Sequence, residues 1–153
     1  MTAKINSTPI MMQLKKEHQE NLALCSNIRR GFIKGIPLNR IKNYVDWYWE
    51  IHLSPHFTYE ERMVFPVLGN DNLLVKRAVT EHKRLRRFFH SKDEVYKALN
   101  RLEEELEAHI RFEERILFKE IAKRGIEKDI GTNDILRSDN KTAEASWPDE
   151  FWK

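Results

Sequence analysis

The chain of 153 residues is poor in the residue types that shape loops or form cross-links, with five Gly, five Pro and a single cysteine, Cys25. One cysteine excludes an intrachain disulfide and a cysteine-based zinc or iron–sulfur site. We therefore expect Cys25 to be a small buried hydrophobe. The alternation of apolar and polar residues that marks β-strands is also scarce. These absences favour a single helical globular domain.

Long hydrophobic runs are missing as well. No run is long enough to cross a membrane, and residues 1–10 lack the apolar core of a secretory signal. We therefore expect no membrane partner and a cytoplasmic location. The net charge is +3, and the densest basic run is residues 83–87. Because acidic residues balance the charge elsewhere, we interpret this run as a solvated helix face and expect no nucleic-acid partner.

Apolar residues recur at three- and four-residue spacing through four segments, which predicts four helices. Gly, Pro and capping residues place them at residues 9–32, 38–65 and 72–89, with the last running from Ser91 or Asp93 to Gly125. We expect Asp71 to cap the third helix. We expect Pro55 to kink the second.

Short connections join antiparallel neighbours in helix bundles. The predicted fold is therefore all-α, an up-down-up-down four-helix bundle over residues 1–125. Residues 126–153 are weakly patterned and are expected to form a C-terminal tail or a short extra helix. The aromatic end of this segment is expected to dock on the bundle or on a partner.

An internal repeat carries the residues of chemical interest. Residues 56–65 and 109–118 share the pattern H-x-x-aromatic-E-E-R-x-x-F. Each copy is preceded, one helix earlier, by a Glu-His pair, at residues 17–18 and 81–82. The chain thus consists of two helical hairpins of one kind.

Spacing within each motif points to a metal. Residues four apart lie one above the other on a helix, so His56 and Glu60 face one point, as do His109 and Glu113. A mixture of imidazoles and carboxylates suits iron, manganese or zinc. Burying such groups without a metal would cost roughly several kcal/mol.

The turn positions predict that the histidines lie at one level of the bundle. In an antiparallel hairpin, ligands at one height lie equally far from the turn between them. The midpoints between successive histidines are Pro37, Gly69 and a point near residue 95, where turns are expected. The predicted metal ligands are therefore His18, His56, Glu60, His82, His109 and Glu113.

These motifs resemble those of the hemerythrin-like family. The signature H-F-x-x-E-E-x-x-x-F-P stands at residues 56–66, and the resemblance covers about residues 9–125. It implies two iron ions, in an Fe-O-Fe or similarly bridged pair, although the donors suit manganese or zinc as well. By position, His18 and His56 would bind one iron and His82 and His109 the other, with Glu60 and Glu113 as bridges.

One departure narrows the functions that the resemblance implies. Oxygen-carrying members have a further His one turn after the third-helix ligand, where this chain has Arg86. The chain resembles the branch with four His and two carboxylates, which implies reaction with, or sensing of, a small diatomic ligand, O2 or NO. The alternative is a redox enzyme that reduces nitric oxide or peroxide, or a protein that supplies iron for cluster repair. The oligomeric state is left as monomer or homodimer.

Some neighbours of the motifs are open to more than one interpretation. His52 lies one turn before His56, so it is either an extra ligand or a residue that lies behind the ligands or lines an access channel. Glu61 and Glu114 point away from their neighbours in a regular helix, and we expect them to pair with surface Arg or Lys. Tyr59 and Phe112 are expected to pack in the core.

Overall fold

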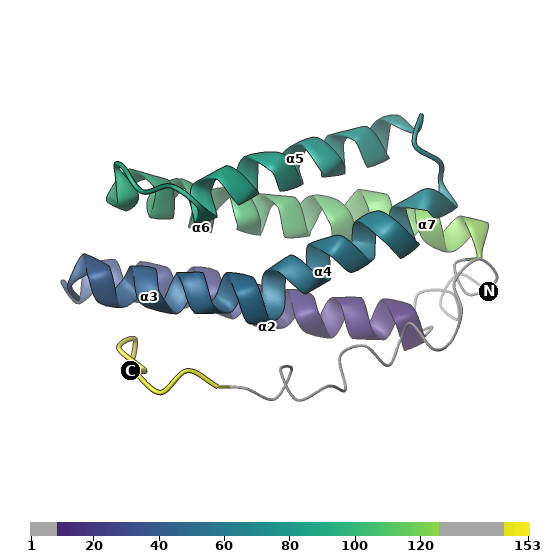
Figure 1. Cartoon of the computed structure of the whole chain (residues 1–153). Coiled ribbons are helices and arrows are strands. Elements are labelled where there is room, and N and C mark those ends of the chain that lie inside the picture. The colour runs from purple at the N-terminus through teal and green to yellow at the C-terminus, as the bar shows by residue number, and fades with distance from the viewer. Residues whose placement is uncertain (1–8, 126–145) are drawn as a thin grey trace.

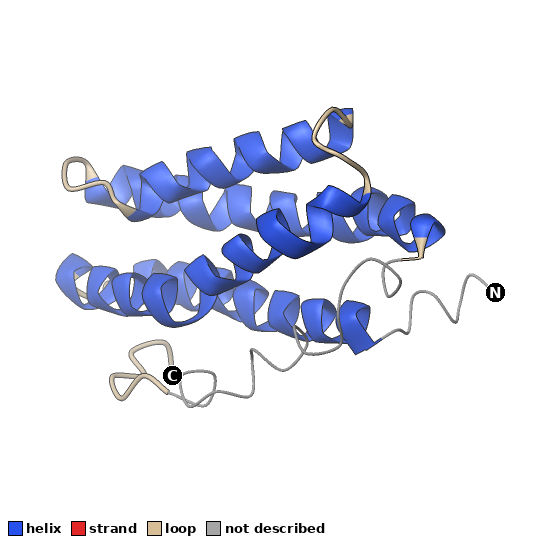
Figure 2. Cartoon of the chain, turned by 45° about the vertical axis from the view of Figure 1, so that its right-hand side comes forward, coloured by secondary structure: helices blue, strands red, loops and turns tan. Residues whose placement is uncertain are grey.

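The structure is a computed structural model that describes residues 9–125 and 146–153. Within these residues all regular structure is helical and there is no strand (Figure 2). The first arm is α2 (Pro9–Ile33) and the third is α5 (Leu73–Phe89). The second arm comprises α3 (Leu38–Tyr48), a π-helical turn (Trp49–Leu53), α4 (Ser54–Tyr59), a second π-helical turn (Glu60–Val64) and a 3-10 turn (Phe65–Val67). The fourth comprises α6 (Val95–Phe112), a π-helical turn (Glu113–Leu117) and α7 (Phe118–Arg124).

The four arms lie side by side as a bundle, joined end to end by short turns (Figure 1). Figures 1 and 2 show α2 beside α3, and α5 beside α6. The helix α6 also packs closely against α2, which closes the bundle. The expected all-α four-helix bundle is confirmed. No helix in the described residues is long and apolar enough to cross a membrane.

The start of α5 and the end of the fourth arm have the caps expected of helices, although the N-cap residue of α5 differs from the predicted one. The N-cap of α5 is Asn72, whose side-chain oxygen accepts hydrogen bonds from the backbone N–H of Leu74 and Val75. The prediction of Asp71 as the cap was therefore wrong by one residue. The fourth arm ends at Gly125, whose φ of 79° is the left-handed conformation expected of a glycine in this position.

Pro55 changes the helix that contains it, as expected. The chain bends between α3 and α4 (Figure 1). The π-helical turn Trp49–Leu53 lies at this bend and ends just before Pro55. Here the backbone N–H of Ser54 bonds to the carbonyl of Trp49, five residues back. The wider turn accommodates a proline that has no N–H to donate.

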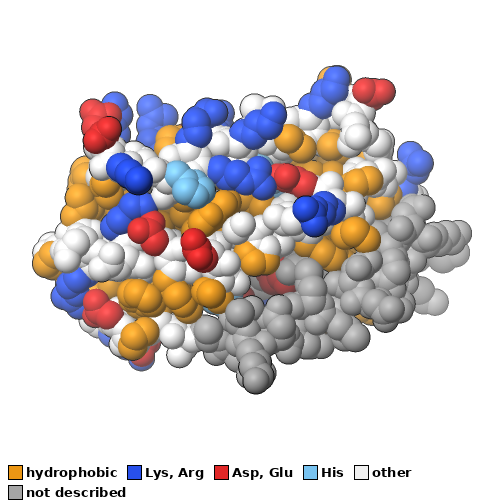
Figure 3. Space-filling view, viewed as in Figure 1, with side chains coloured by type: hydrophobic (Ala, Val, Ile, Leu, Met, Phe, Trp, Pro, Cys, Tyr) orange, Lys and Arg blue, Asp and Glu red, His pale blue; other side chains and the backbone are white. Residues whose placement is uncertain are grey.

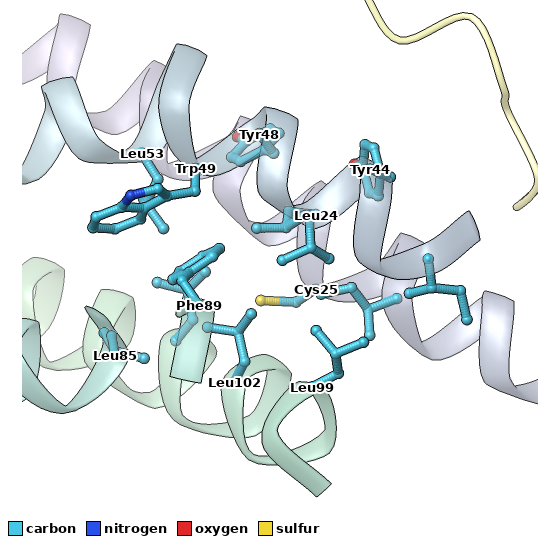
Figure 4. Packing of buried hydrophobic residues seen from close by; sticks show 14 of the residues in the cluster. Leu24, Cys25, Tyr44, Tyr48, Trp49, Leu53, Leu85, Phe89, Leu99 and Leu102 are labelled. Atoms are coloured by element: carbon cyan, nitrogen blue, oxygen red, sulfur yellow. The ribbon is translucent and has the colours of Figure 1, made fainter. Parts of the chain in front are cut away.

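Two hydrophobic clusters fill the bundle. One contains Leu24 and Leu102, and part of it is shown in Figure 4. The other contains Leu14 and Leu117. On α2, His18 lies between Leu14 and Leu24, so the predicted ligands lie between two apolar layers.

Cys25 belongs to the first cluster, as predicted, and is fully buried (Figure 4). Burial raises the pKa of its thiol to about 12. The thiol therefore stays protonated at neutral pH and is a packing residue.

The C-terminal residues 146–153 lie against α2 and α3 (Figure 1). Phe151 is buried and makes an edge contact with Tyr44, at 5.5 Å between ring centroids. Asp149 accepts two hydrogen bonds from the guanidinium of Arg40, at 2.9 and 2.7 Å. Of the two docking alternatives, the described residues adopt the one on the bundle. Residues 126–145 lie outside the described residues, so the predicted domain boundary stays a prediction.

Apolar burial, rather than the ion pair, should hold this segment in place. We expect Phe151→Ala to release it, because removing a buried phenyl ring costs about 3 kcal/mol. Arg40→Ala should change little, since exposed ion pairs contribute weakly to stability. Tryptophan fluorescence reports the release, because Trp147 and Trp152 pack against the same surface. A larger red shift in Arg40→Ala than in Phe151→Ala would contradict this account.

Candidate metal centre

The six predicted ligands occupy core positions of the helices. On α2, Leu14, His18, Asn21 and Cys25 follow one another at three- and four-residue spacing, and all are buried. His82 similarly takes a core position on α5. Each of the six ligands is at most 2% exposed. The same periodicity that builds the core therefore directs these polar side chains inward.

The structure brings the six side chains together in two groups. One contains His18 and His56, and the other contains His82 and His109; Glu60 and Glu113 belong to both. Within each group, one nitrogen or oxygen atom per residue lies within 4.8 Å of the others. The pairing of histidines is the one that position in the sequence suggested.

Each shared carboxylate offers one oxygen to each group. Glu60 Oε2 lies 3.3 Å from His56 Nε2, and Glu60 Oε1 lies 3.2 Å from His82 Nε2. Glu113 Oε1 lies 2.9 Å from His18 Nε2, while its Oε2 lies 3.1 Å from His109 Nε2. This arrangement suits carboxylates that bridge two cations.

A second set of carboxylates, which sequence reasoning did not assign, contacts the far side of each of the four histidines in these groups. Each Nδ1 lies 2.6–2.7 Å from a glutamate oxygen on another arm. The pairs are His18 with Glu114, His56 with Glu17, His82 with Glu61, and His109 with Glu81. The four contacts follow the internal repeat, in which Glu17 corresponds to Glu81 and Glu61 corresponds to Glu114.

These contacts fix the histidine tautomers. An ionised carboxylate only accepts hydrogen bonds, so each Nδ1 carries the hydrogen and donates it. When the ring is neutral, Nε2 then directs its lone pair toward the centre, the orientation that metal-bound histidines adopt. His82 Nε2 and His109 Nε2 are only 3.1 Å apart. Two lone pairs at this distance repel unless a proton or a metal ion lies between them.

The two shared carboxylates, Glu60 and Glu113, also indicate a positive partner. Within the described residues, both oxygens of Glu60 and Oε2 of Glu113 are buried without a hydrogen-bond partner. Buried carboxylate oxygens normally have a donor or a cation beside them. The residues present therefore fit a pair of metal ions.

In the metal-free protein, protons balance these charges. Burial lowers the pKa of His56 and of His109, but the nearby carboxylates outweigh it and raise each to about 9. The same competition raises the pKa of His18. Burial raises the pKa of Glu60, but His56 and the other imidazoles hold it well below its usual range. Binding of a metal must then displace protons.

A π-helical turn begins at each of the two shared glutamates. One spans Glu60–Val64 and the other Glu113–Leu117, at equivalent places in the repeat. Such turns are rare and occur frequently at functional sites. The residue after each of these glutamates contacts a histidine on another arm: Glu61 reaches His82, and Glu114 reaches His18. The prediction of surface partners was therefore wrong for Glu114 and incomplete for Glu61, which also pairs with Arg86.

The remaining candidates lie outside the two groups. His52 is half-buried and contacts the rings of Trp47 and Tyr48, at 5.2 and 4.8 Å between centroids. It is not among the residues grouped around either metal position in the described part of the chain. Tyr59 packs in the second hydrophobic cluster, as expected.

A helix bundle that buries two His and Glu groups able to hold metal is a cation-binding bundle. Residues 10–91, more than half of the chain, match the family described as the hemerythrin HHE cation binding domain. The chain belongs to this family. The second motif, at residues 109–118, lies beyond the match and joins the site through the fold. No curated protein and no solved structure matches the chain.

Proposed function

We propose that the protein binds two iron ions and reacts with, or senses, a small diatomic ligand, O2 or NO. The observation that carries this proposal is that Glu60 and Glu113 are shared between two histidine pairs. His18 and His56 would hold one iron, and His82 and His109 the other. We assign the six residues as ligands on this basis.

The donor count supports a reactive centre over a closed structural site. Each position receives two imidazole nitrogens and one oxygen from each bridging glutamate. Iron commonly takes about six donors, so these four leave positions for an external ligand. When bound, the iron pair supplies these open positions and the capacity to exchange electrons. The two apolar layers exclude water from it.

The chain's own residues hold the histidines ready for this chemistry. Glu17, Glu61, Glu81 and Glu114 each retain the Nδ1 hydrogen of one ligand, which keeps its ring oriented and its Nε2 available. Because the four partners lie on different arms, assembly of the bundle also assembles the site.

The proposal is tested with protein expressed in iron-supplemented medium. Elemental analysis should find about two irons per chain, with an optical spectrum in air that dithionite changes. Less than about one metal per correctly folded chain would exclude the iron proposal. Manganese or zinc in place of iron would keep the site but remove the proposed ligand chemistry.

Stopped-flow mixing separates the diatomic ligand from the alternative. The reduced protein is mixed with O2 or with NO, and the absorption is followed. A band that forms and then disappears under vacuum supports reversible binding. Prompt oxidation without such a band supports the alternative, a redox enzyme acting on nitric oxide or peroxide.

A further inference from the structure

The two metal positions have different charged surroundings, although the repeat makes their ligands alike. Glu61, which binds His82, is ion-paired to Arg86 at 3.1 Å. Its counterpart Glu114 binds His18, and no Lys or Arg in the described residues lies within ion-pairing distance of it. Sixty-four residues separate His18 from His82, and the same offset places Leu22 opposite Arg86.

The position at His82 and His109 has a second arginine beside its other carboxylate. Glu81, which binds His109, accepts a hydrogen bond from the guanidinium of Arg77 at 3.0 Å. At the equivalent point, Glu17 accepts one from the neutral amide of Gln13 at 2.8 Å. The position at His82 and His109 therefore has Arg86 where the other has Leu22, and Arg77 contacts its second carboxylate.

Arg86 also lies near His82 through the ring of Phe57. Its guanidinium carbon lies 5.8 Å from the centroid of Phe57, whose ring stacks on His82 at 3.8 Å. The residue equivalent to Phe57 is Ile110, which has no ring to transmit such a contact.

We propose that Arg86 makes the two metal positions unequal, so that the position at His82 and His109 binds its cation more weakly. This inference rests on the proposed metal centre. A guanidinium shares the negative charge of its carboxylate, which then withdraws less of the Nδ1 hydrogen and leaves Nε2 a poorer donor. Its positive charge also repels the cation directly. Both effects favour the lower charge state of a metal at this position.

Figure 3 shows several Lys and Arg side chains along α5, and one residue of this helix, Arg84, provides a matched control. Arg84 lies on the same helix and carries the same charge, but it pairs with Glu105, which does not contact a ligand histidine. Lys15 and Arg111 act on Glu114 only through longer-range charge. They reduce the inequality without removing it, because neither is in contact with that carboxylate.

The test is a titration of the metal-free full chain with Co2+ as the probe, followed by visible absorption and by NMR of 15N-labelled histidines. Two binding steps are expected, with the resonances of His18 and His56 shifting in the first. Arg86→Gln should strengthen the second step by roughly three- to tenfold and draw the steps together. Arg86→Lys, which keeps the charge, should restore the separation, and Arg84→Gln should leave it unchanged.

The outcomes separate this inference from the proposed function. Failure of the wild-type chain to bind two ions overturns both. Two ions bound with equal affinity, or binding steps that Arg86→Gln does not move, overturn the inference alone. Equal effects of Arg84→Gln and Arg86→Gln would show a general charge effect and also overturn it.

Discussion

Glu60→Ala and Glu113→Ala should each cost the protein its paired metal centre. Each glutamate gives one oxygen to each metal position, so its loss removes a donor from both ions at once. We expect the metal content to fall from about two ions per chain to about one or fewer, with loss of the spectrum of a coupled pair. Elemental analysis and optical and electron paramagnetic resonance spectra measure these changes.

Glu103→Ala is the matched control for the loss of a buried carboxylate. Glu103 also lies on the fourth arm and is 7% exposed, but it pairs with Arg29 at 2.6 Å and belongs to neither metal group. We expect this variant to lose stability and to keep its metal. An unchanged spectrum in Glu60→Ala or Glu113→Ala would show that the bridge assignment is wrong.

The clustering of the six predicted ligands could be anticipated because it follows from helix geometry and from the positions of the turns. His56 with Glu60, and His109 with Glu113, are four residues apart, which fixes their common direction on any helix. His18 could be placed at the same height in the bundle as His56, because the turn at Pro37 is equally far along the chain from both. The fold could also be predicted from the sequence, since its four apolar stripes end at glycines, prolines and capping residues.

The carboxylates behind the histidines could not be predicted in the same way. The expectation for Glu61 and Glu114 assumed a regular helix, in which successive residues point about 100° apart. Both side chains meet Nδ1 of a histidine on another arm, where only surface cations were expected. Glu17 was visible beside His18, but its partner is His56 on another arm, and sequence order does not encode that contact. The repeated Glu-His pairs were the available signal.

Removing the metal should lower the thermal stability of the protein strongly. A cation that binds only the folded chain stabilises it by about 4 kcal/mol at a thousandfold excess over its dissociation constant. For a chain of this size, about 1 kcal/mol corresponds to roughly 2–4 °C in Tm. Treatment with a chelator should therefore lower Tm by roughly 10 °C, which calorimetry measures.

This difference should widen as the pH rises from about 6.5 to about 9. His56 and His109 each have a pKa raised to about 9 in the metal-free fold, against 6.5 as the ordinary value. The protonated rings stabilise the metal-free fold fully below pH 6.5, and this contribution is lost as the pH rises through 9. The loaded protein has neutral rings, and its apparent metal affinity rises by about tenfold per pH unit for each proton displaced. A difference in Tm between loaded and metal-free protein that stays constant or shrinks over this range would show that protons do not compete with the metal for these nitrogens.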